Sequence, residues 1–328
     1  MSTSKPRITI IGLGMVGASL GLALQQAEVA SAIVGHDLDP LASTKAKKLG
    51  AVDRTYWNLI SACEDADLVI LAIPVGAIED TLEAIGADLR PGCVVMDTTA
   101  VKAPVMVWAA RHLPAGIHFV GTNPILSTTV PGRGGLEGAR ADLFQRGLFC
   151  IVPSTTADAA SVKLVTDLVS IVGARPLFLD AAEHDGLLAA VDHLPDLLAL
   201  AMLETVIHQP MWRELRKVAG PGFGASTQLV TAASLAQSEL YGLNRENVIR
   251  WLDALSHSLT TIRESLAAGQ SEALTEQFQK AFEERQQWLA GRTTGEWHEG
   301  PRTEMPPKMS LMDTFLGTFW RRNPRKEE

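Results

Sequence analysis

Short apolar runs of strand length alternate with helix-like segments through the first half of the chain. Alternation of this kind is typical of a mostly parallel β-sheet that is covered by helices on both faces. We therefore predict an α/β domain over residues 1–181. Its expected strands are Arg7–Ile11, Ala32–Gly35, Leu68–Ala72, Val94–Asp97, His118–Val120, Leu148–Val152 and Pro176–Leu179.

After about Ala181 the apolar residues recur at helical spacing, with few strand-like runs. This pattern predicts an all-α domain over residues 182–291, and such domains often dimerise through their apolar faces. Residues 292–328 are rich in proline, glycine and charge, and we expect a tail that is partly disordered or forms a docking arm. Its apolar segment, Met309 to Trp320, could pack on its own subunit or bind a partner. The expected helices are Ala182–His208, Thr227–Ser238, Arg245–Ala268 and Ser271–Gly291.

Composition narrows the function classes. The chain has 328 residues, of which 46% are hydrophobic and 20% charged, so it is long enough for two folded domains. A net charge of −8 predicts no nucleic-acid partner and no anionic membrane surface. The polar N-terminus and the lack of an apolar run of about 18 residues favour a cytoplasmic location. The three cysteines form no CxxC pair, which predicts neither a disulfide nor a metal site.

A glycine-rich motif directly follows the first expected strand and opens a helix, Ala18–Gln26. The first glycine permits a tight turn, the second lets the backbone approach a pyrophosphate, and the third allows close helix–strand packing. Backbone N–H groups at the start of the helix would face the phosphates. The motif therefore predicts a Rossmann domain that binds a dinucleotide, with a phosphate loop of Gly12, Leu13, Gly14, Met15, Val16 and Gly17.

The second expected strand ends in Asp37, at the position where a carboxylate can accept hydrogen bonds from both ribose hydroxyls and would repel a 2′-phosphate. We therefore predict NAD as the cofactor. NADP stays possible because Lys45, Lys47 and Lys48 follow closely. The neighbouring His36 and Asp39 are expected to face solvent. In the next strand, Pro74 is expected either to shape the cofactor loop or to end the strand only.

Several motifs in order resemble the prephenate and arogenate dehydrogenases of tyrosine biosynthesis. They are GLGMVGASLGLAL, GHDLDP, LVILAIPV, MDTTAVK, HFVGTNP, AAEHDGLLAAVDHLPD and GFGASTQL, and they span about residues 7 to 290. The resemblance implies a Rossmann domain and a helical domain that forms a homodimer. It also implies hydride transfer from a cyclohexadienol carbon to a nicotinamide while the ring carboxylate leaves as CO2. A base or hydrogen-bond acceptor holds the ring hydroxyl, and cationic groups hold the carboxylates.

The chain departs from this family pattern at four substrate-handling positions. Ala100 stands where the family has a serine, and Asn123 stands where it has the catalytic histidine. Asp196 replaces a second histidine, and Gln228 replaces an arginine that grips a carboxylate. An asparagine can hydrogen-bond a hydroxyl but cannot take its proton near neutral pH. Since the cofactor motifs are intact, the departures favour a different and less anionic substrate.

Lys102 and His193 match residues of the family and are the remaining candidates for the chemistry. Lys102 follows a strand end and could orient a substrate oxygen or carboxylate, or it could be a solvated lysine at a helix start. His193 could transfer a proton, or it could be a satisfied core histidine. Asp192 and Asp196 share one helical face; they could bind an amine, although a helix–helix polar contact is the simpler explanation.

Two further histidines, His184 and His118, are not expected to be catalytic. His184 matches a family run at the start of the dimer helix, which suggests a mainly structural role. His118 should point to the face of its strand opposite Asn123, because side chains alternate along a strand.

Together these features predict an NAD(P)-dependent dehydrogenase of the prephenate/arogenate type. Two alternatives stay open: a cofactor-binding regulatory or scaffold homologue without prephenate turnover, and a dehydrogenase or reductase with a different, less anionic substrate.

Overall fold

The structure, a computed structural model, describes residues 5–127, 135–231 and 238–294. These residues form two compact units that divide between His184 and Asp185, within helix α7 (Ala181–Leu188). The division lies close to the predicted domain boundary after residue 181. Almost all of the tail lies outside the described residues, so its docking role stays a prediction.

Unit 1 contains one eight-stranded sheet with the strand order β3-β2-β1-β4-β5-β6-β7-β8. The strands from β3 to β6 are parallel, β7 runs antiparallel to β6, and β8 runs parallel to β7. All seven predicted strands are present, and β3 escaped prediction because it has only two residues. The strands are β1 Arg7–Ile11, β2 Ala32–His36, β3 Arg54–Thr55, β4 Leu68–Leu71, β5 Val94–Asp97, β6 His118–Ile125, β7 Leu148–Pro153 and β8 Arg175–Phe178.

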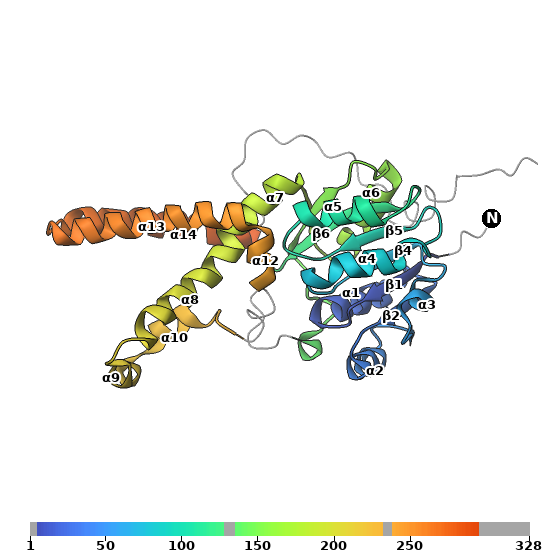
Figure 1. Ribbon diagram of the computed structural model, residues 1–328, viewed down its shortest axis with the longest axis horizontal. Coiled ribbons are helices and arrows are strands. Elements are labelled where there is room, and N and C mark those ends of the chain that lie inside the picture. Colours follow the sequence, from blue (N-terminus) through green and yellow to red (C-terminus); the bar gives the residue numbers. More distant parts are fainter. Residues whose placement is uncertain (1–4, 128–134, 232–237, 295–328) are drawn as a thin grey trace, which may run out of the picture. The chain divides into compact units, whose positions relative to one another are not determined.

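Helices cover the sheet, as Figure 1 shows for α4 and α5, which lie side by side. Strands β4 and β5 are buried along their whole length because both of their faces are covered, which explains their uninterrupted apolar sequences. Side-chain caps start three of the helices: Asp39 begins α2, Asn58 begins α3 and Asp158 begins α6. The helices of this unit are α1 Met15–Gln26, α2 Pro40–Leu49, α3 Leu59–Cys63, α4 Ile78–Gly86, α5 Ala103–His112 and α6 Ala159–Ile171.

The strand order reverses between β1 and β4, which places a topological switch point at the carboxyl ends of these two strands. Open α/β sheets bind ligands in the crevice at such a point. The glycine loop follows β1 directly, so the fold presents this loop at the edge where a dinucleotide is bound.

Unit 2 is entirely helical in its described residues and has few buried side chains. The apolar segment Ala181–Ile207 is long and hydrophobic enough to span a membrane by length and composition, with 22% of its most apolar window buried. The α-helices after α7 are α8 Leu194–Ile207, α9 Trp212–Val218, α10 Pro221–Thr227, α12 Ser238–Leu243, α13 Arg245–Ala267 and α14 Ser271–Thr294, and a π-helical turn, Ala189–His193, joins α7 to α8.

The predicted helix Thr227–Ser238 is wrong over residues 228–231, and residues 232–237 lie outside the described part of the chain. Helix α10 instead ends at Thr227. Pro221 occupies the first turn of α10, where a missing N–H is tolerated. The glycines that follow Pro221 read as a loop in the sequence, because glycine is a poor helix former.

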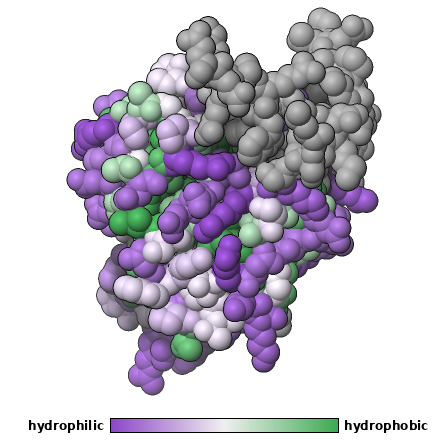
Figure 2. Space-filling view, turned by 90° about the vertical axis from the view of Figure 1, so that its right-hand side faces the viewer, coloured by the Kyte–Doolittle hydropathy of each residue, from purple (hydrophilic) through white to green (hydrophobic). Residues whose placement is uncertain are grey.

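Large apolar side chains remain exposed on unit 2, among them Phe278 and Phe282 of α14 and Leu259 of α13. Figure 2 faces unit 1, where hydrophobic residues form separate patches among hydrophilic ones. The exposed apolar side chains of unit 2 match the prediction of a helical domain with apolar outer faces.

Candidate active site

The glycine loop has the geometry that a pyrophosphate needs. Gly12 has φ +90°, and a Cβ there would lie 2.3 Å from the Ala72 carbonyl oxygen. A Cβ on Gly17 would lie 1.9 Å from the Gly12 carbonyl oxygen, so the helix packs directly against the loop. A Cβ on Gly14 would meet no atom within 4 Å, so the backbone at the start of α1 is open on that side. Each glycine therefore occupies the place predicted for it.

Helix α1 begins at Met15, three residues earlier than predicted, with Gly14 as its N-cap. Gly14 provides no side chain to cap the helix, so the first N–H groups of Met15, Val16 and Gly17 are available to an anion. The helix macrodipole adds a partial positive charge at this end. The loop therefore fits the phosphates of a dinucleotide.

Asp37 lies directly beside the glycine loop. Its Oδ2 accepts a hydrogen bond from the Leu13 N–H at 2.7 Å, and its Oδ1 accepts one from the Asp39 N–H at 2.8 Å. These two bonds fix the carboxylate at the carboxyl end of β2, where each oxygen keeps a further lone pair. The arrangement suits two ribose hydroxyls and disfavours a 2′-phosphate.

Replacing Asp37 with alanine is expected to weaken NAD binding by about 10–100-fold, since hydrogen bonds to a charged group contribute about 1.5–3 kcal/mol. Isothermal titration calorimetry of the purified protein measures the change. Asp39→Ala is the matched control, because it removes a nearby carboxylate that only caps α2. Equal affinities of Asp37→Ala and Asp39→Ala for NAD would contradict this role of Asp37.

His36 was expected to face solvent, and this prediction is wrong. Asp39 is exposed as expected. His36 is only 5% exposed, and its Nδ1 lies 3.0 Å from the Tyr56 carbonyl oxygen. It is the last residue of β2, and the connection after β3 covers it. Pro74 is exposed after β4, where it caps a 3-10 turn, Val75–Ala77, at the cofactor edge.

Lys102 is fully buried, so the alternative of a solvated lysine is wrong. Its Nζ forms an ion pair with Asp97 at the end of β5 and lies 3.1 Å from Thr99 Oγ1. The Asp97 side chain also accepts a hydrogen bond from the Thr122 N–H at 3.2 Å. This buried network joins β5, β6 and the start of α5. Lys102 therefore holds these elements together close to half-buried Ala100, and protein groups already bind its ammonium.

Asn123 and His184 form a buried pair within unit 1. Asn123 lies in β6, where it pairs with Cys150 of β7, and His184 lies in α7. Asn123 Nδ2 is 3.2 Å from His184 Nε2, and the two residues are 5% and 0% exposed. The position that carries the catalytic histidine of the resembling family therefore holds an amide that contacts an imidazole.

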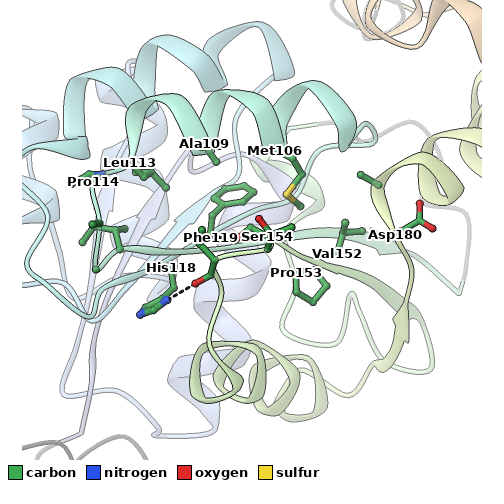
Figure 3. Close-up of a pocket in the computed structure, with 17 residues that line it drawn as sticks. Met106, Ala109, Leu113, Pro114, His118, Phe119, Val152, Pro153, Ser154 and Asp180 are labelled. Atoms are coloured by element: carbon green, nitrogen blue, oxygen red, sulfur yellow. Dashed lines mark hydrogen bonds between the residues drawn. The ribbon is translucent and has the colours of Figure 1, made fainter.

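A cavity of about 610 Å³ lies between α5 and the strands β6 and β7 (Figure 3). It is lined by the start of β6 and the end of β7, on the opposite edge of the sheet from the glycine loop. His118 borders this cavity, and its Nδ1 lies 3.3 Å from the Thr156 carbonyl oxygen. The location agrees with the expectation that His118 does not replace the missing base.

In unit 2, His193 is buried within the π-helical turn that joins α7 to α8. Its Nδ1 lies 3.3 Å from Asn244 Nδ2, and its ring meets the Tyr241 ring edge-on at 5.7 Å. Asn244 also donates to the Asp185 carbonyl oxygen at 2.8 Å. His193 Nε2 lies 3.9 Å from Asp192 Oδ2, so a carboxylate as well as neutral groups surrounds the ring. Its proton-transfer role stays a prediction.

Asp196 makes a polar contact between helices, as the simpler explanation required. Its Oδ2 accepts a hydrogen bond from Tyr241 Oη at 2.9 Å, and burial raises the pKa of Asp196. Burial and the nearby Asp196 charge raise the pKa of Asp192 to about 6, although its side chain keeps 57% of its surface exposed. Asp192 and Asp196 together form an acidic pair, which a nearby cation would stabilise in its charged form.

The free energy of unfolding should report the titration of Asp192. Its folded pKa lies above the unfolded value, so the folded state binds the proton more tightly, and stability falls as pH rises from about 4 through 6. Asp192→Asn removes the titrating carboxyl group, so this fall in stability with pH should disappear. Urea denaturation should show Asp192→Asn gaining stability over the original chain between pH 4 and pH 7. A constant difference across this range would contradict the raised pKa.

Gln228 is the exposed residue that follows α10. Glutamine carries no charge, so position 228 supplies no cation where the family has an arginine. Among the described residues, no three of His, Cys, Asp and Glu gather in a way that could hold a metal ion.

Sequence reasoning missed the closest partners of the predicted site residues. His184 was expected to be mainly structural, yet it contacts Asn123. Asp97 ends a strand at the edge of the sheet where the cofactor is expected, and this position could have identified it as a site residue. Tyr241 is one of only two tyrosines in the chain, a scarcity that gave a weak signal.

Known proteins match both units. Two family models match: the nucleotide-binding domain of prephenate dehydrogenase over residues 20–177 and its dimerization domain over residues 180–280. A probable prephenate dehydrogenase of Streptomyces niveus is 30% identical over 262 residues, covering 78% of this chain and 68% of that protein. A 4-amino-4-deoxyprephenate dehydrogenase of Streptomyces pristinaespiralis is 30% identical over 141 residues, 43% of each protein.

Among solved structures, the prephenate dehydrogenase of Aquifex aeolicus in complex with hydroxyphenyl propionate and NAD+ has a TM-score of 0.80 and 25% identity. The match covers 87% of this chain and 99% of that one. The fold, the glycine loop and the two family models agree. The chain therefore belongs to the prephenate dehydrogenase family and is an NAD-dependent dehydrogenase.

Proposed function

We propose that this enzyme oxidises and decarboxylates a cyclohexadienyl carboxylate that carries an amino group. The family match over both units is the observation that carries the reaction class. The relatives include prephenate, arogenate and 4-amino-4-deoxyprephenate dehydrogenases, whose substrates differ in whether and where they bear an amine.

Unit 1 supplies the groups that would hold NAD. The N–H groups at the start of α1 would bind the pyrophosphate, and Asp37 would bind the adenosine ribose. NAD, when bound, accepts the hydride. The chain's own task is then to orient the substrate ring and to exclude water.

The charge of the predicted substrate groups supports an amine. Gln228 replaces a cation that would favour a carboxylate, and Asp196 replaces a histidine with an acid. Asp192 adds a second acid one helical turn away, and its burial, together with the Asp196 charge, raises the pKa of Asp192. Each change lowers the affinity for an anion and so favours a substrate with less negative charge.

We also propose a homodimer formed through unit 2. The dimerization-domain match supports it, as do the exposed apolar side chains of α13 and α14. A second subunit would cover such side chains, which gives the apolar segment Ala181–Ile207 an explanation that needs no membrane. The cytoplasmic location stays a prediction from the sequence.

A second candidate is a cofactor-binding homologue that does not turn over these substrates. It is favoured by Asn123, which cannot act as the base. NADH absorbance with prephenate, arogenate and 4-amino-4-deoxyprephenate, together with calorimetry of NAD binding, separates the two. NADH formed from an amine-bearing substrate supports the proposal, whereas NAD binding without NADH from any of the three overturns it.

A further inference from the structure

We propose that His184 is a positioning residue that turns the Asn123 amide so that its oxygen accepts a hydrogen bond from an amino group on the reacting ring carbon. This inference rests on the proposed function and names where the amine of the substrate lies. It concerns two residues of unit 1 that the sequence separates by 61 positions.

The amide nitrogen of Asn123 can only donate a hydrogen bond. Since Nδ2 is the atom that lies 3.2 Å from His184 Nε2, this imidazole nitrogen must accept. In this arrangement the proton of the imidazole lies on Nδ1. The opposite rotamer would need the other tautomer of His184, with Nε2–H donating to the amide oxygen.

The orientation leaves Asn123 Oδ1 as the end of the amide that does not contact His184. None of the described residues donates a hydrogen bond to this oxygen. The backbone cannot swing it away, because Asn123 is held in the ladder between β6 and β7 opposite Cys150. The pair therefore offers one fixed acceptor and no base on Asn123 itself.

The amine enters this step in its neutral form, so an ammonium ion first gives its proton to water. From the neutral amine the reaction balances with no further proton leaving the nitrogen. The C–H bond at the amino-bearing ring carbon breaks, and its electron pair goes to NAD as a hydride. The C–C bond to the ring carboxylate breaks, and its pair completes the aromatic ring as CO2 leaves. The products are an aromatic amine, CO2 and NADH.

An acceptor without basicity suits an amine better than a hydroxyl. As the hydride leaves, positive charge develops on the ring carbon, and a neutral nitrogen donates its lone pair to that carbon more strongly than oxygen does. A hydroxyl needs a base to draw off its proton as this charge develops. An amine needs only an acceptor that holds one N–H and aims the nitrogen, which Asn123 Oδ1 provides.

Two substitutions of His184 test the pair. Glutamine keeps a side-chain oxygen that can accept from Asn123 Nδ2, whereas leucine removes the acceptor at similar size. We expect His184→Leu to lower kcat/KM by about 10-fold or more on 4-amino-4-deoxyprephenate and much less on prephenate. His184→Gln should restore most of the loss. Equal losses on both substrates, or a glutamine variant as impaired as the leucine variant, would overturn the proposal.

NMR spectroscopy tests the contact between His184 and Asn123 without any turnover. Long-range ¹H–¹⁵N spectra of the histidine rings should show His184 Nε2 unprotonated at neutral pH in the protein with NAD, and Asn123→Leu should shift this resonance. A protonated Nε2 would reverse the amide and overturn the inference. If none of the three substrates gives NADH, the proposed function fails, and the spectra still decide the orientation of Asn123.

Discussion

Replacing Asn123 with histidine is expected to raise kcat on prephenate by about 10²–10⁴-fold, the usual contribution of a positioned general base. The new imidazole would stand on β6 at the position where the resembling family has its catalytic histidine. It could draw off the hydroxyl proton as the hydride leaves, which the amide cannot do. Initial rates of NADH formation with saturating NAD measure the change.

Asn123→Gln is the matched control, because it changes the side-chain length and adds no base. It should leave the rate on prephenate near that of the original chain. Asn123→His should also lose preference for the amine-bearing ring, since the fixed acceptor is gone. If Asn123→His binds NAD normally and prephenate turnover does not rise above that of Asn123→Gln, position 123 does not face the reacting carbon.

Lys102→Met is expected to lower the free energy of unfolding by about 3–5 kcal/mol, the usual effect of breaking a buried ion pair from one side. The substitution leaves the Asp97 carboxylate in the interior, where both side chains have no exposed surface. The N–H of Thr122 and the hydroxyl of Thr99 still donate to it, but neither neutralises its charge. Urea denaturation followed by circular dichroism measures the loss.

Lys163→Met provides the comparison at a partly exposed pair. Lys163 meets Asp167 one helical turn away on α6, with 42% of the lysine side chain exposed, so its loss should cost less than about 1 kcal/mol. Adding Asp97→Asn to Lys102→Met should recover part of the loss because the stranded charge disappears. A Lys102→Met variant as stable as Lys163→Met would mean that this lysine is available to a substrate.

The sequence was sufficient to predict the sheet and the phosphate loop, because both depend on local patterns. The strands carry continuous apolar runs, and Gly12 and Gly17 occupy positions where any side chain would collide with backbone. The glycine pattern is local in the sequence, although the atom that a Cβ on Gly12 would meet is the Ala72 carbonyl oxygen. The predicted strands are therefore confirmed, with β6 running on to Ile125 beyond the predicted end at Val120.

The partners of the site residues could not be predicted in the same way. The contact between Asn123 and His184 joins two residues that lie far apart in the chain, and no local pattern marks it. The ion pair between Lys102 and Asp97 is short-range in sequence, yet a lysine after a strand end usually reaches solvent. Helix α10 was missed because its two glycines are poor helix formers, although Pro221 suits a first helical turn.

The most direct test of the account is the ratio of NADH to CO2 released from 4-amino-4-deoxyprephenate labelled in its ring carboxylate. The account predicts one CO2 for each NADH, together with the aromatic amine as the organic product. NADH without labelled CO2 would show a different oxidation, and release of neither from the NAD-bound protein would contradict the proposed dehydrogenase chemistry.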